Sequence, residues 1–210
     1  MINKADPPVF TPDDEPYLGR HPLYVFDTLI ISSLEMNSAV AAYTHSHQQS
    51  RLQRAAAQII PQGINLALSI RELLRQGHLF SAAVLLRSLI ERAAIISYLW
   101  RNPDEIATWE DGWRHRERPS LTKMLADMHP DTDLEGAKAV CSTFNHLVHG
   151  DPMGAEFNLV ALSEDALGYD VGRVTDNPEL CDFVCDQAIC WLSVLTSMMA
   201  GCFPEMKEDG

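Results

Sequence analysis

The most apolar helical pattern in this chain is HLFSAAVLLRSLIERAAIISYLW, residues 78–100. A helix that is apolar on almost every side has to be covered by other elements. We therefore expect a central buried helix surrounded by further helices. Its apolar positions recur at helical spacing around nearly the whole circumference: Leu79, Ala82, Ala83, Leu86, Leu89, Ile90, Ala93, Ile96 and Trp100.

Start and stop signals outline more helices on both sides of this segment. Asn102, Ser120 and Asn177 are candidate N-caps, and Gly77 is a candidate helix stop. Pro61 falls inside an otherwise helical pattern, where proline kinks or breaks a helix. These signals predict helices over residues 22–43, 51–76, 78–100, 103 onward, 121–129, 133–148 and 178–202.

No repeat and no interior linker divides the 210 residues. We expect one all-α helical bundle over residues 21–210, preceded by a disordered, acidic, proline-rich arm over residues 1–20. The pattern changes between the last two helices. There, residues 157–161 and 169–174 flank a polar turn at 163–165, which predicts a small β-hairpin or an irregular loop.

Composition and charge exclude several classes of protein. With 29 acidic and 16 basic residues, the net charge of -13 argues against a standing basic surface for nucleic acid. The N-terminus has no signal-peptide core, and the five cysteines fit reduced thiols of a cytoplasmic protein. Cys181 and Cys185 are one helical turn apart, and buried thiols fit them better than a metal site. The uncharged run 187–203 lies at the lower limit for a bilayer span. We predict that it is a core helix, with no membrane partner.

Polar residues form two stripes on two apolar helices. The first stripe consists of Arg87, Glu91, Arg92 and Tyr98, and the second of Lys138, Ser142, Asn145 and His149. A charge in an apolar setting needs a partner. A histidine at a helix C-terminus beside an arginine suits acid–base work on a phosphodiester. The alternative is structural: a buried Arg87–Glu91 ion pair, with Asn145 and His149 ending their helix.

Two segments resemble a known group of proteins. SAAVLLRSLIERAAIISYLWRNPDE, residues 81–105, looks like the signature helix of an uncharacterised bacterial family of helical proteins, and FNHLVHG follows at residues 144–150. This arrangement is similar to the HEPN superfamily, whose motif is an arginine, a polar residue and a later histidine. Asn145 and His149 match that motif, and Phe144 stands at the arginine position.

The resemblance implies a metal-independent endoribonuclease, or a nucleotide-binding component, of a bacterial toxin–antitoxin or phage-defence system. It also implies a homodimer and no cofactor. His149 would act on the ribose 2′-hydroxyl, Arg87 or Arg92 would stabilise the phosphorane, Asn145 would orient the phosphate and Glu91 would hold the arginine. Further ligand contacts are expected from Tyr98, Ser142 and His146.

The alternative function is a catalytically inactive helical module that binds a partner protein or a small ligand. Phe144 at the arginine position and the charge of -13 both favour it. One basic, aromatic segment, residues 109–118, could hold a nucleic-acid strand, but interleaved acidic residues favour a solvated face. A metal shared by His146 and His149 is disfavoured, because such spacing is common by chance.

Overall fold

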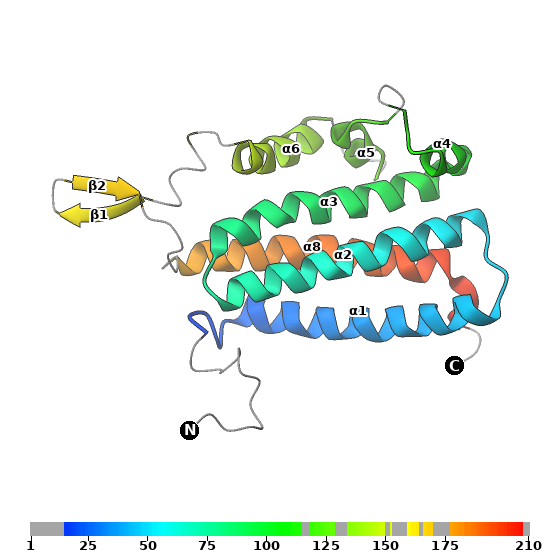
Figure 1. Cartoon of the computed structure of the whole chain (residues 1–210), viewed down its shortest axis with the longest axis horizontal. Coiled ribbons are helices and arrows are strands. Elements are labelled where there is room, and N and C mark those ends of the chain that lie inside the picture. Colours follow the sequence, from blue (N-terminus) through cyan, green and yellow to red (C-terminus); the bar gives the residue numbers. More distant parts are fainter. Residues whose placement is uncertain are drawn as a thin grey trace.

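The computed structural model of the chain describes residues 15–114, 118–128, 134–149, 152, 159–163, 166–169 and 177–207. It is an all-α bundle with one small hairpin (Figure 1), which confirms the predicted fold class. The α-helices are α1 (His21–Ser46), α2 (Arg51–Arg75), α3 (Leu79–Arg101), α4 (Ile106–Glu110), α5 (Leu121–Asp127), α6 (Leu134–Val148) and α8 (Pro178–Cys202). Short 3-10 turns, Pro103–Glu105 and Pro204–Lys207, follow α3 and α8.

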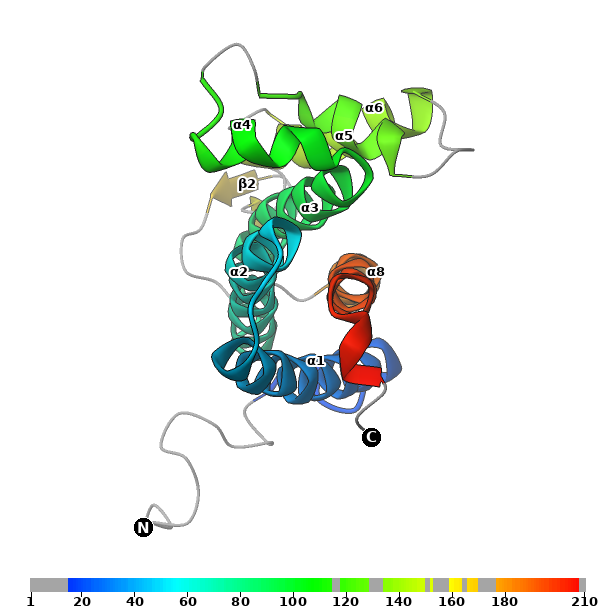
Figure 2. The same ribbon diagram turned by 90° about the vertical axis from the view of Figure 1, so that its right-hand side faces the viewer.

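The helices form two unequal layers around α3. Viewed end-on, α1, α2 and α3 form an arc around α8, while α4, α5 and α6 lie on the other side of α3 (Figure 2). Accordingly α3 packs against α2, α8, α6 and α5. Leu86, Leu89, Ile90 and Ile96 are fully buried. The predicted central helix is confirmed.

Two of the three candidate N-caps are confirmed. The Ser120 hydroxyl accepts a hydrogen bond from the Lys123 amide, and the Asn177 side chain accepts one from the Leu180 amide at 2.9 Å. The third, Asn102, is wrong, because its side chain makes no cap. Asn102 follows directly after α3, and its side-chain amide donates back to the Tyr98 carbonyl of that helix and to the Asp127 carboxylate.

Pro61 does not break α2, which runs in one piece from Arg51 to Arg75. An internal proline costs a helix about 3 kcal/mol. Ile59, Ile60 and Ile64 are buried beside it, and this packing offsets the lost hydrogen bond. Helix α2 also lies very close to α8, because a Cβ at Gly63 would clash with the side chain of Leu195.

The connection from α2 to α3 is a tight turn through Gly77. Gly77 has φ +75°, a left-handed conformation that glycine adopts without strain. The Gly77 amide donates to the Leu74 carbonyl and the His78 amide donates to the Leu73 carbonyl at 2.8 Å, which closes the helix end. The predicted helix stop is therefore confirmed.

The chain segment before α1 packs against the bundle. Tyr17 is 4% exposed, and the buried Glu15 carboxylate accepts a hydrogen bond from Arg71 of α2 at 3.2 Å. Arg20 pairs with Asp182 of α8, with Nε 2.6 Å from Oδ1. Residues 15–20 therefore pack on the bundle, whereas we expected them to belong to a disordered arm. Residues 1–14 of that arm lie outside the described residues.

A two-stranded hairpin follows α6 in the chain. Strand β1 (Leu159–Ser163) pairs antiparallel with β2 (Ala166–Tyr169), with Leu159 opposite Tyr169 and Ser163 opposite Ala166. The second strand thus begins at Ala166, before the predicted range 169–174. The connection after β1 is short, so the residues directly after this connection pair with β1. Residues 170–174 lie outside the described ranges.

In the described part of the chain, α8 alone is long and apolar enough to cross a membrane, and 39% of its apolar window is buried. It packs against α1, α2 and α3. That is the packing of a core helix. The absence of a membrane partner stays a prediction.

The C-terminal turn of α2 leads to a prediction about pH. The hydrogen bond from Arg75 lowers the pKa of Glu72 to about 2, from an ordinary value of 4.5. A carboxyl with a lowered pKa in the folded state stabilises the fold above its unfolded pKa, and the effect is lost as pH falls through the folded pKa. Urea unfolding should therefore show Glu72→Gln less stable than wild type at neutral pH. The difference should shrink from about pH 4.5 towards pH 2. A difference that stays constant with pH would contradict it.

Candidate functional site

The structure brings the two polar stripes together across α3 and α6. The Nε of Arg87 on α3 donates to the Oδ1 of Asn145 on α6 at 3.2 Å. Nη1 of the same guanidinium lies 3.5 Å from the Glu91 carboxylate, one turn along α3. Arg87 is therefore held by one acceptor on each helix, and its side chain is 22% exposed.

The apolar side of α6 places Asn145 at the edge of this interface. Ala137, Cys141, Phe144 and Leu147 are buried on that side, and Phe144 stacks on Phe183 of α8 with ring centroids 6.3 Å apart. The next residue along a helix is turned by about 100°. Asn145 therefore leaves the core and meets Arg87, while Phe144, at the arginine position of the family motif, stays inside it.

A residue that the sequence analysis missed completes the cluster. Arg118, in the segment between α4 and α5, forms an ion pair with Oε1 of Glu91, whereas Arg87 contacts Oε2. Its guanidinium also lies 5.8 Å from the ring centroid of Trp113. The available signal was its place in the basic, aromatic segment 109–118, which we expected to be a solvated face. Residues 115–117 lie outside the described part.

His149 lies at the C-terminal end of the same stripe. Its backbone amide donates to the Asn145 carbonyl at 3.0 Å, and its ring is exposed. Within the described residues no contact joins that ring to Arg87 or Asn145. The structure thus places the exposed His149 one helical turn from Asn145, and no described residue fixes the orientation of its ring.

The other predicted residues are more scattered. Arg92 turns towards α2, where its Nε donates to Gln62 at 2.9 Å. Tyr98 is 5% exposed near the other end of α3, and burial raises the pKa of its hydroxyl. Ser142 and His146 form a hydrogen-bonded pair on α6 at 3.2 Å. Lys138 pairs with Glu135 at 2.7 Å.

The arrangement suits an anion. An arginine oriented by two acceptors presents its remaining N–H groups in a fixed plane, which matches a phosphate or carboxylate. The contacts described here engage Nε and Nη1 of Arg87 and leave Nη2 without a partner in the described chain. Two guanidinium groups share the single Glu91 carboxylate, so the cluster keeps a net positive charge. Across the described ranges, no three His, Cys, Asp or Glu side chains come together as metal ligands.

Comparison with known proteins gives one match. Residues 53–116 match the model of a family that is described as a family of unknown function (DUF5677). The matched segment is less than half of the chain. This segment contains Arg87 and Glu91 and ends before α6. No curated protein and no solved structure matches the chain.

Proposed function

We propose that this protein is a HEPN-like helical protein that binds and cleaves an RNA phosphodiester without a metal, in a bacterial defence or toxin–antitoxin system. The observation that supports the proposal is the Arg87–Asn145 hydrogen bond. It joins the arginine of one stripe to the asparagine of the other, and the histidine lies one turn further along α6.

Each residue has a distinct role in this proposal. Arg87 and Asn145 hold the phosphate oxygens, and Glu91 keeps the guanidinium in place. His149 takes the proton from the ribose 2′-hydroxyl. The 2′ oxygen then forms a bond to phosphorus, the bond to the 5′ oxygen breaks, and that oxygen takes a proton from water. Arg87 takes the role of the motif arginine that Phe144 replaces. Its guanidinium contacts Asn145, whereas the guanidinium of Arg92 contacts Gln62.

A second copy of the chain would bring two such sites together. The resemblance to HEPN domains implies a homodimer with the motifs facing each other. An exposed His149 at the end of α6 suits that arrangement, because its ring can then meet substrate held by the facing copy. Homodimerisation is part of this proposal.

The test is cleavage of end-labelled RNA in EDTA. Wild type should cleave, and His149→Ala should lose about 10²- to 10⁴-fold in rate, as expected for a general acid or base. Arg87→Ala should lose activity, and Arg92→Ala should keep it. His45→Ala, which removes an exposed histidine of α1, is the matched control and should cleave like wild type.

The alternative is a catalytically inactive module, and Phe144 supports it. This side chain is 2% exposed where the motif has an arginine. Glu91 also holds both nearby guanidinium groups, which weakens their pull on a polyanion. Wild-type protein that leaves RNA intact in EDTA would overturn the ribonuclease proposal and favour the module.

A further inference from the structure

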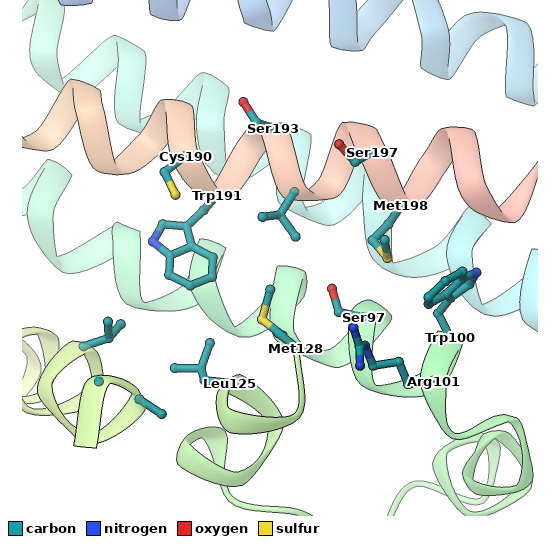
Figure 3. A pocket seen from close by; sticks show the side chains of 14 residues that line it. Ser97, Trp100, Arg101, Leu125, Met128, Cys190, Trp191, Ser193, Ser197 and Met198 are labelled. Carbon is teal, nitrogen blue, oxygen red and sulfur yellow. The ribbon is translucent and has the colours of Figure 1, made fainter. Parts of the chain in front are cut away.

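A cavity of about 480 Å³ lies between α8, α3 and the α5–α6 layer (Figure 3). None of the residues of the Arg87–Asn145 contact lines it. Its walls are largely apolar, and ligand pockets of ~300–1,000 Å³ with such walls commonly hold small molecules. Leu125, Val140, Val194 and Met198 provide aliphatic surface, and Trp100 and Trp191 provide two indole rings.

Two buried polar atoms in this wall have no hydrogen-bond partner among the described residues. They are the Ser97 hydroxyl and the Trp191 indole nitrogen, on side chains that are 5% and 9% exposed respectively. Leaving a buried polar group without a partner is energetically unfavourable. Both atoms lie beneath the cavity surface, so a ligand reaches them only if the surrounding side chains shift.

The positively charged side chain of Arg101 lies at one end of the cavity. Arg101, the last residue of α3, lies one turn beyond Ser97 on the same side of the helix (Figure 3). In the described chain, Arg101 forms no ion pair. Trp100 and Met198 lie at this end, and Cys190 and Trp191 lie at the other. Met198 lies eight positions after Cys190, which is about 12 Å along α8.

We propose that this cavity binds a medium-chain aliphatic carboxylate, with the acyl chain lying along α8 between the two indole rings and the carboxylate on Arg101. An apolar body matches the walls, and a single anionic head matches Arg101, the one cation among the described residues that line the cavity. A nucleotide fits less well, because its several phosphates would meet one arginine and its polar sugar would meet apolar walls.

The thiol of Cys190 gives a direct way to watch the cavity. It lines the cavity and is exposed, whereas Cys141, Cys181, Cys185 and Cys202 are buried. The predicted burial of Cys181 and Cys185 is confirmed, whereas Cys190 is exposed because its position on α8 faces this cavity instead of the core. A thiol reagent such as 5,5′-dithiobis(2-nitrobenzoate) should therefore react first at Cys190.

The experiment uses decanoate as the probe, below its micelle concentration. Calorimetry on the full chain should show one site, and decanoate should slow the reaction of Cys190 at least fivefold. Decanol, which has the same chain and no charge, should bind at least tenfold more weakly. Arg101→Gln should weaken decanoate binding at least tenfold and leave decanol binding unchanged. Lys123→Gln, at an exposed cation of α5 outside the cavity, should change neither.

Two results would overturn the inference. The first is the absence of saturable decanoate binding by wild type. The second is equal loss with Arg101→Gln and Lys123→Gln, which would mean general attraction of the anion. A further variant, Val194→Trp, fills the cavity and should abolish binding of both probes. None of these measurements involves RNA, so their outcome is independent of the proposed ribonuclease.

Discussion

An arginine placed at position 144 should strongly destabilise the protein instead of completing the family motif. Phe144 is 2% exposed and stacks on Phe183 of α8 with an interplanar angle of 18°. Loss of a buried phenylalanine side chain costs about 3–5 kcal/mol, and an unpaired guanidinium in the same place costs more. Phe144→Arg should therefore lower the free energy of unfolding by at least about 4 kcal/mol.

Urea unfolding followed by circular dichroism measures this effect. Thr143→Arg is the matched control, because it puts the same side chain on the exposed face of α6 one residue earlier. That substitution should change stability by about 0.5 kcal/mol or less. A Phe144→Arg protein as stable as wild type, with RNA cleavage above wild type, would show that this position faces the site and not the core.

Loss of Arg71 should have the second largest effect. Its side chain is 13% exposed and holds two carboxylates, Asp27 of α1 with Nε 2.5 Å from Oδ1, and Glu15 at 3.2 Å. The Glu15 side chain is only 1% exposed. Arg71→Ala would leave that carboxylate buried without its cation, which costs about 3–5 kcal/mol in comparable cases.

The comparison is with an exposed ion pair of similar chemistry. Arg51 and Glu110 have side chains that are 56% and 29% exposed, so Arg51→Ala should cost about 1 kcal/mol or less. The double variant Arg71→Ala with Glu15→Gln should recover part of the loss, because a neutral amide tolerates burial better than a carboxylate. Equal costs for Arg71→Ala and Arg51→Ala in urea unfolding would contradict a stabilising role of the buried Arg71–Glu15 ion pair.

Local patterns were enough to predict most of the helices. Ser120 and Asn177 begin helices because their side-chain oxygens accept backbone amides a few residues ahead, and Gly77 ends one because it adopts a left-handed conformation. The apolar circumference of residues 79–100 likewise predicts burial, since no face of that helix suits water. All these signals lie within a single helix or at its ends.

Contacts between distant residues decided the rest. Pro61 stays inside one helix because α2 packs against α3 and α8. Residues 15–20 pack on the bundle because Arg71 and Asp182 pair with Glu15 and Arg20. At the candidate site, the spacing of residues showed the two stripes. It did not show that Arg87 and not Arg92 meets Asn145, nor that Arg118 joins Glu91. The cavity beside α8 could not be predicted from the sequence, because its walls come from four helices that only tertiary packing brings together.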